Sequence, residues 1–216
     1  MLAPTLPYYL YVKNNLESDS IMTSATLSML DQAELLQLAL NASAAADSGA
    51  AIGYLKEAVS RPDGSAAAHY MLGAEYAQIK MYARAIDEME AALALDPALS
   101  VARLQLGLLW LAGNDSARAA EVLAGLDAVS AQDPLHHFGR GLQYLIREEL
   151  AEAEDSLRQG IGLNQSNPAL NGDMQKVLGE IAISRAAAPP AASKAAEIGE
   201  GERSILLSAY TGNQSH

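Results

Sequence analysis

The sequence predicts an all-α fold in which about four antiparallel helix pairs stack in a right-handed array, with a capping helix at the C-terminal end. Three observations predict it. Half of the 216 residues are hydrophobic and only 5% are aromatic, and alanine and leucine, both strong helix formers, are abundant. Small and apolar residues recur with a period of 34 residues. Pairs such as Asp96-Pro97 separate the periods, because the residue before a proline leaves the helical region.

The period places small residues where the two helices of a pair would touch. The first helix of each pair carries one of Ala39, Gly73, Gly107 and Gly141. The second helix carries an alanine and, four residues later, a leucine or methionine: Ala51 and Leu55, Ala85 and Met89, Ala119 and Leu123, Ala153 and Leu157. Small residues let helix backbones approach closely. We therefore expect Gly107 to lie in close contact with the helix that bears Ala119.

A motif within this period resembles the tetratricopeptide repeat (TPR). The second unit shows it best, with Leu72-Gly73-x2-Tyr76, Ala85-x3-Met89, Ala92 and Pro97. The third unit follows with Leu106-Gly107 and Trp110. The resemblance implies a right-handed TPR α-solenoid over residues 31–167, with four units at about 32–65, 66–99, 100–133 and 134–167.

Two units depart from the family pattern. The first has Ala42 in place of the aromatic residue that follows the small residue in the other units. The fourth has His137 and Arg140 where the family prefers large apolar side chains. These departures leave the exact packing of the fourth unit open.

Segments outside the repeats have other roles. Residues 1–30 are expected to form an N-terminal extension, with Met22 as an alternative start. The apolar run at 1–12 has no basic residue before it and contains two prolines, unlike an export signal, so we expect a cytoplasmic protein. Residues 168–186 are expected to form the capping helix. Residues 187–216 are expected to be a linker and a flexible tail, whose apolar cluster at 205–207 we hypothesise to bind back to the chain's own groove.

The resemblance also implies a concave groove lined by the first helices of the units. Its positions in the third and fourth units are nearly all apolar, and the helix at 101–111 is apolar almost all round. Either neighbouring helices bury this second face or it remains open to a partner. Our candidates for the partner-binding groove are Tyr70, Leu104, Leu108, Leu111, Leu135, Phe138, Leu142, Leu145 and Ile146.

Composition and motifs exclude several function classes. The chain has 14 basic and 26 acidic residues, for a net charge of −12, which disfavours nucleic acid because phosphate contacts require lysine and arginine. No apolar stretch is long enough to span a membrane. There is no cysteine, and we find no catalytic, metal-binding or cofactor-binding motif. We therefore expect neither an enzyme nor a cofactor.

The leading functional hypothesis is a protein–protein interaction scaffold that binds an apolar or amphipathic segment of a partner in the groove. An alternative is a bacterial secretion chaperone that keeps a hydrophobic client soluble. The acidic character, the compact array, the apolar groove and the segment 138–154 weakly resemble the TPR-type class II chaperones of type III secretion. A third hypothesis is an assembly subunit that acts through its tails. The partner is expected to be a protein or peptide, and a homo-oligomer is left open.

Overall fold

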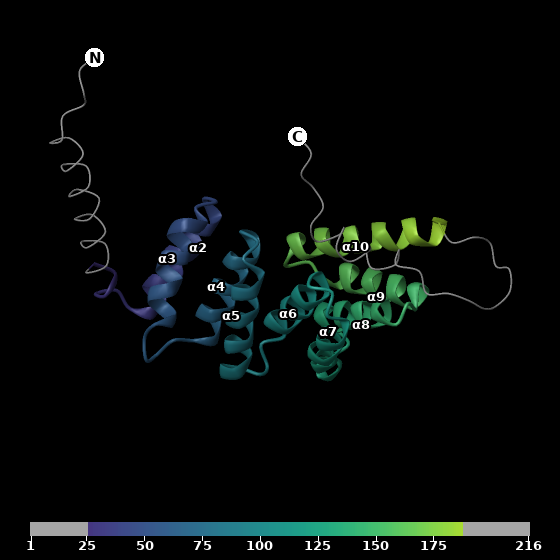
Figure 1. Cartoon of the computed structure of the whole chain (residues 1–216), viewed down its shortest axis with the longest axis horizontal. Helices are drawn as coiled ribbons and strands as arrows, with labels where there is room; N and C mark the ends of the chain where they lie inside the picture. Colours follow the sequence, from purple (N-terminus) through teal and green to yellow (C-terminus); the bar gives the residue numbers. More distant parts are fainter. Residues whose placement is uncertain (1–25, 188–216) are drawn as a thin grey trace, which may run out of the picture. The chain divides into compact units, whose positions relative to one another are not determined.

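The structure is a computed structural model, and it describes residues 26–187. Within this range it contains nine α-helices, one 3₁₀ helix and no strand (Figure 1), which confirms the predicted all-α fold. The chain divides after Met81 into two compact units, hereafter the first and the second unit. The four periodic segments of the sequence are called repeats from here on. Met22, the tail cluster at 205–207 and most of the predicted extension and linker lie outside the described residues.

The first unit contains α2 (Gln32–Ala44), α3 (Ser48–Val59) and α4 (Ala66–Gln78). Each helix begins at a side chain that accepts a hydrogen bond from the helix's first turn. Asp31 and Glu34 form a reciprocal capping box at α2, with both N···O distances 2.8 Å. Asp47 caps α3 and Ser65 caps α4. The three helices meet in one apolar cluster of Leu35, Ala58 and Ala68.

Arg61, in the α3–α4 connection, ties the segment before α2 to this unit. Its guanidinium donates to the carbonyl oxygens of Leu27 and Leu30, the former at 2.7 Å. Glu57 holds the same guanidinium at 3.1 Å from the preceding turn of α3. Hydrogen bonds to a charged group are stronger than neutral ones, so this arginine fixes how the chain enters α2.

The second unit contains α5 (Tyr82–Leu95), α6 (Ser100–Ala112), α7 (Ser116–Ala124), η1 (Gly125–Ala128), α8 (Pro134–Ile146), α9 (Leu150–Leu163) and α10 (Pro168–Ala187). Contacts pair α6 with α7 and α8 with α9. One apolar core runs through α6, α7, η1, α8, α9 and α10. The predicted second repeat contains the division between the units, because α4 lies in the first and α5 in the second. The repeat boundaries remain predictions.

Close helix approach at two glycines explains the 34-residue period. A Cβ atom added to Gly107 would lie 2.5 Å from Cδ2 of Leu123, and one added to Gly141 would lie 2.7 Å from Cδ2 of Leu157. Any side chain at these two positions would therefore collide with the next helix. Leu123 lies on α7 with Ala119, so the close contact predicted for Gly107 is confirmed.

A second periodic feature was missed from the sequence. The turns that close the first helix of each pair contain a residue with φ near +60°, and these residues are also 34 apart: Ala46, Lys80, Asn114 and Glu148. In the α8–α9 turn, Glu148 N donates to Leu145 O and Glu149 N donates to Tyr144 O, both at 3.0 Å. This is the Schellman arrangement of a helix C-terminus. The same turn recurs at the other three positions.

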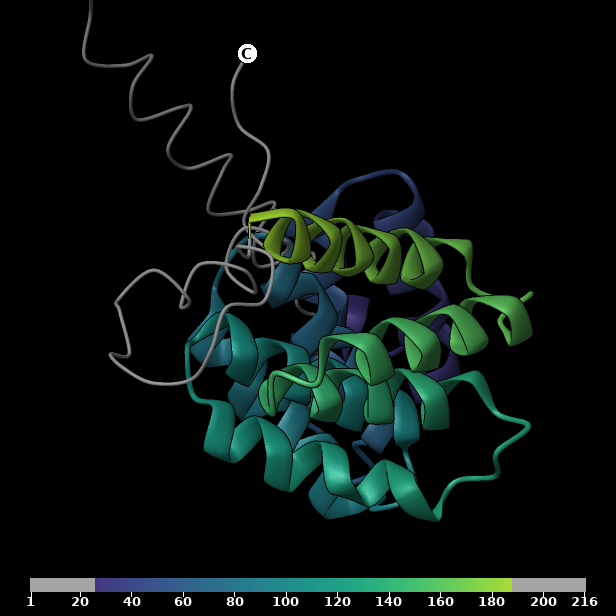
Figure 2. The same ribbon diagram turned by 90° about the vertical axis from the view of Figure 1, so that its right-hand side faces the viewer.

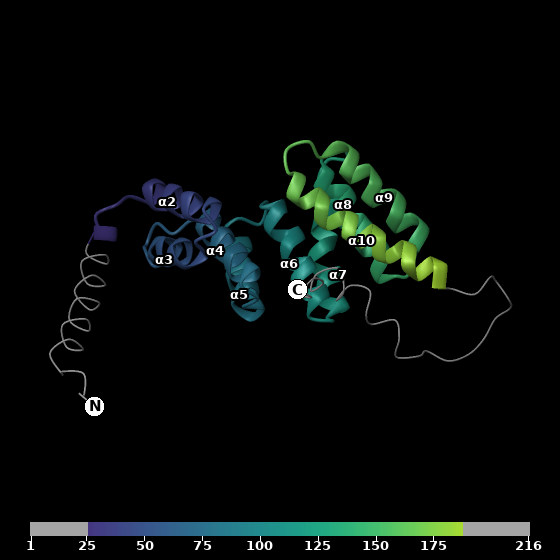
Figure 3. The same cartoon turned by 90° about the horizontal axis from the view of Figure 1, so that it is seen from above.

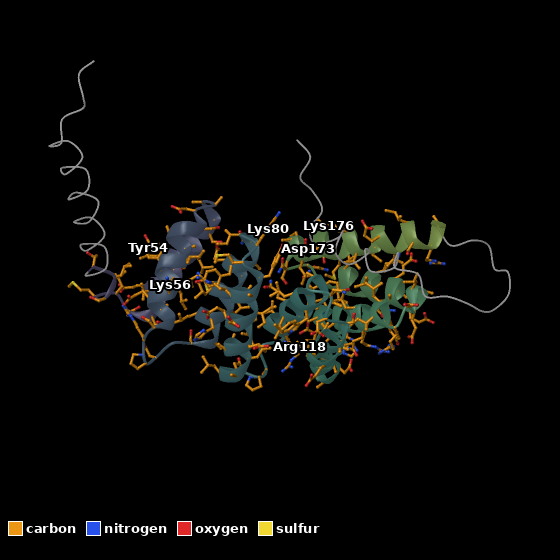
Figure 4. All side chains as sticks on the ribbon, viewed as in Figure 1. Tyr54, Lys56, Lys80, Arg118, Asp173 and Lys176 are labelled. Atoms are coloured by element: carbon orange, nitrogen blue, oxygen red, sulfur yellow. The ribbon has the colours of Figure 1, made fainter. Side chains whose placement is uncertain are left out.

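α10 packs along α9 and completes the core with Met174, Val177 and Ile181 (Figures 2 and 3). Its outer face carries Asp173 and Lys176, which form an exposed ion pair at 2.9 Å (Figure 4), together with the exposed Ile183. Repeat arrays need a terminal element with a polar outer face. α10 therefore has the properties of the capping helix predicted at 168–186.

Candidate functional site

The structure places six of the nine predicted groove residues in the core of the second unit. Leu104, Phe138 and Leu142 have no exposed surface, and the others are nearly as buried. All six belong to the cluster that α7, α9 and α10 also supply: Leu104, Leu108, Leu111, Phe138, Leu142 and Leu145. Of the two alternatives for this apolar face, burial therefore holds for these six residues, because α6 and α8 bury the face against one another and against their neighbours. A partner-binding role for the six remains a prediction.

The other three predicted groove residues are more accessible. Leu135, at the start of α8, and Ile146, at its end, are half-buried at the edge of the core. Tyr70 lies on α4 in the first unit and is also half-buried, and burial raises the pKa of its hydroxyl. Of the eight candidates in the second unit, only Leu135 and Ile146 therefore retain substantial accessible side-chain surface.

The accessible end of the predicted groove opens into a pocket of about 600 Å³ in the second unit. We call it the loop pocket. It lies at the N-terminal ends of α6, α8 and α10 and is lined by Val101, Ser130, Gln132, Asp133, Pro134, Leu135, Asn164, Ser166, Asn167 and Leu170. Val101, Leu135 and Leu170 supply apolar surface, one from each helix, and polar loop residues surround them. Leu135 and Leu170 also pack against the core.

Buried Asn164 organises one wall of the loop pocket. Asn164 is only 5% exposed. Its side-chain nitrogen Nδ2 donates at 2.8 Å to both Asn167 O and Asn171 Oδ1. Its Oδ1 accepts from the Asn167 amide at 3.1 Å, and its carbonyl accepts from Asn171 Nδ2 at 2.9 Å. A buried polar side chain with all partners in place holds a loop in one conformation. The α9–α10 side of the pocket is therefore preformed.

The opposite wall is fixed by helix capping. Asp133 accepts a hydrogen bond from the Leu135 amide at 2.8 Å, and Pro134 occupies the first position of α8. Ser130 accepts one from the Gln132 amide at 3.2 Å. Both walls therefore have fixed backbones, while Val101, Leu135 and Leu170 remain half-buried between them.

Sequence reasoning found Leu135 and missed the polar residues of the pocket. A signal was present, because Asp96, Ser130 and Asn164 are 34 apart. Each side chain accepts a hydrogen bond from a backbone amide two or three residues later, the Asp96 bond being 2.9 Å. Asp, Asn and Ser make such turns with their own backbone. The period therefore extends into the connections between repeats, where the prediction considered only the prolines.

Residues 26–187 lack two other kinds of functional feature. In this range no three His, Asp or Glu side chains are grouped so that they could hold a metal ion. No helix there is long and apolar enough to cross a bilayer.

Comparison with known proteins supplies structures and no sequence relatives. No family model matches the chain, and no curated protein matches it. A solved structure of MamA residues 41 to the end from Desulfovibrio magneticus RS-1 has a TM-score of 0.55 at 18% identity and covers 85% of this chain and 93% of its own. A double mutant of MamA RS-1 gives 0.54 at 17%, covering 85% and 94%.

A third solved structure is the C-terminal part of a TPR repeat-containing protein from Cytophaga hutchinsonii. It has a TM-score of 0.52 at 14% identity and covers 96% of this chain and 78% of its own. Likeness at these identities reports the arrangement of helices and not a shared activity. Together with the periodic glycine contacts and turns, it shows that the chain has the all-α solenoid fold of the tetratricopeptide repeat.

Proposed function

We propose that the protein is a non-catalytic interaction scaffold and that an apolar side chain of a partner protein inserts into the loop pocket. The observation that carries this proposal is the pocket itself. Three apolar residues from three successive first helices, Val101, Leu135 and Leu170, remain half-buried around a space of about 600 Å³. A preformed space that combines apolar side chains with fixed polar groups can orient a bound segment.

The polar border favours an extended or turning segment of the partner over a flat surface. Ser130, Gln132, Ser166 and Asn167 lie around the apolar residues, and their side chains can exchange hydrogen bonds with a peptide backbone. The apolar residues would accept one anchoring side chain, as in interfaces where a few buried anchors supply most of the binding energy. The groove hypothesis is thereby restricted to the accessible end of the groove.

A matched pair of variants tests this proposal. Leu135→Glu places a carboxylate in the loop pocket, and Ile183→Glu makes the same kind of change on α10, at a side chain that is 63% exposed and outside the pocket. We expect Leu135→Glu to weaken binding of a co-purified partner by about 2 kcal/mol or more, and Ile183→Glu to leave it unchanged. Photo-crosslinking from position 135 should identify the same partner. Equal binding by both variants with retained folding would contradict the proposal.

A further inference from the structure

We propose that an exposed face of α8 binds a side-chain carboxylate of an acidic protein segment, at a site separate from the loop pocket. The face borders a hollow of about 320 Å³ between α8 and η1. We call it the α8 hollow. It is lined by Asp127, His136, Arg140, Gln143, Tyr144 and Arg147.

The fourth repeat has lost an apolar contact at this face. The residues 34 and 68 positions before Arg140 are Leu106 and Leu72, and both are buried, with 2% and 1% exposure. Arg140 itself is exposed. Arg140, which departs from the family pattern in the fourth repeat, therefore does not distort the core. It replaces a buried leucine with a cation at the surface.

The helix before α8 explains why the position is open. α5 carries Ile86 and Leu93, and the corresponding positions 34 residues later are Ala120, on α7, and Asp127, in η1. A methyl group and a carboxylate replace two large apolar side chains. At Arg140 the flank of α8 faces the α8 hollow, although α7 and η1 both pack against α8.

The donors of the hollow are held in place around one aromatic ring. The guanidinium carbon of Arg140 lies 5.6 Å from the centre of the Tyr144 ring, and that of Arg147 lies 4.8 Å from it. Arg140 Nη2 also donates to the Tyr144 hydroxyl at 2.8 Å. Contact with the ring and the hydroxyl restrains the flexible arginine side chains before any ligand binds.

Arg140 has no carboxylate partner among the described residues, and the described bond of Arg103 likewise goes to a neutral acceptor, the Pro97 carbonyl. Arg118, Arg147, Arg158, Lys176 and Arg185 each pair with a carboxylate within the described part of the chain. The described bonds of Arg140 go to the Tyr144 hydroxyl, which is neutral. The guanidinium thus keeps most of its five N–H donors for a ligand.

The acidic and imidazole groups of the hollow each have a partner within the chain. Asp127 Oδ1 accepts from Gln143 Nε2 at 3.2 Å. Glu149, beside the hollow, pairs with Arg147 at 3.1 Å. His136 Nδ1 lies 3.3 Å from the Leu126 carbonyl, which can only accept, so Nδ1 carries the hydrogen. Arg147 is thus paired within the chain, whereas Arg140 has no carboxylate partner among the described residues.

One guanidinium without a carboxylate partner fits one carboxylate. A carboxylate matches the two parallel N–H donors of arginine and carries a single charge. A phosphate dianion would place its second charge near Asp127, in a chain whose net charge is already −12. We therefore assign the ligand as a glutamate or aspartate side chain of a partner.

The test is an NMR titration of the full chain with the peptide acetyl-Glu-Glu-Glu-amide, with acetyl-Gln-Gln-Gln-amide and inorganic phosphate as comparison ligands. We expect the Arg140 and Gln143 side-chain resonances to shift with the glutamate peptide, and added NaCl to weaken the effect. Arg140→Gln should reduce affinity at least about tenfold, whereas Arg158→Gln, an exposed arginine of α9 outside the hollow, should change it less than twofold. Asp127→Asn keeps an acceptor for Gln143 and should tighten binding.

Three results would overturn the assignment. Equal losses in Arg140→Gln and Arg158→Gln would show a general charge effect. Shifts absent from the hollow would place the peptide elsewhere. Tighter binding of phosphate than of the glutamate peptide would refute the carboxylate specificity. The circular dichroism spectra of all variants establish that they are folded.

Discussion

Gly107 offers a quantitative test of the helix-pair packing. In Gly107→Ala, the new Cβ would lie 2.5 Å from Leu123 Cδ2 and 2.6 Å from Leu123 Cγ, whereas carbon atoms pack best at about 3.5–4.0 Å. Leu123 has no exposed surface, so its side chain or the helix must move by about 1 Å. Overpacking of this kind costs about 1–3 kcal/mol. Alanine also favours the helix over glycine by about 1 kcal/mol, which opposes that cost.

Gly179→Ala is the matched control, because a Cβ at Gly179 on α10 would meet nothing within 4 Å. This variant should gain the helix-propensity term alone, about 1 kcal/mol. The difference between the two variants therefore isolates the overpacking term, and we expect Gly107→Ala to be less stable than Gly179→Ala by about 1–3 kcal/mol. Denaturant unfolding followed by far-UV circular dichroism measures both.

A double-mutant cycle identifies the atoms responsible. Leu123→Ala removes the side chain that the new Cβ would touch, so it should cost less in the Gly107→Ala background than in the wild type, by the overpacking term. If Gly107→Ala stabilises the protein as much as Gly179→Ala does, the two helices are not in close contact at this glycine and the packing account is wrong.

Two further predictions concern turns and charges. Glu148→Gly should raise the free energy of unfolding by about 0.5–1 kcal/mol, because glycine relieves the strain of the positive φ in the α8–α9 turn. Asn114→Gly should raise the free energy of unfolding by less, since asparagine tolerates that conformation. Equal increases in the two variants would contradict the explanation. The hydrogen bond from Arg158 lowers the pKa of the half-buried Glu154 carboxyl, so Arg158→Gln should raise this pKa in a carboxyl NMR titration. Because the pKa is lowered in the folded state, the pair's stabilising effect is present above the ordinary carboxyl pKa and is lost as the pH falls through the lowered value. An unchanged Glu154 pKa would contradict the assigned cause.

The sequence predicted the parts of the fold that depend on repeated local contacts. Gly107 and Leu123 occupy fixed columns of the period, and a close helix contact needs only these two residue types at that spacing. The start of α8 was equally readable, since Asp133 and Pro134 carry both the cap and the first-turn proline. Such features are specified within one repeat and then recur.

Whether the groove is open or buried could not be predicted from the sequence in the same way. Leu142 occupies a concave position of the family, and only the packing of neighbouring helices decides whether such a side chain is open or buried. Met174 and Ile181 of α10 share its core cluster, and the number and fit of stacked helices are properties of several repeats together. Arg140 was noticed as a departure, but its exposure depends on the small residues that α7 and η1 present to α8.

Cysteine labelling tests most directly the claim that, within the predicted groove along α6 and α8, only the end at the loop pocket is accessible to a partner. The chain contains no cysteine, so single cysteines at positions 135 and 142 report on two predicted groove residues, one half-buried in the loop pocket and one with no exposed surface. We expect the thiol at 135 to react with a disulfide reagent at least about a hundredfold faster, since the thiol at 142 must wait for local unfolding. Equal rates in two folded variants would show that the groove along α6 and α8 is open, and would contradict the restriction of partner binding to the loop pocket.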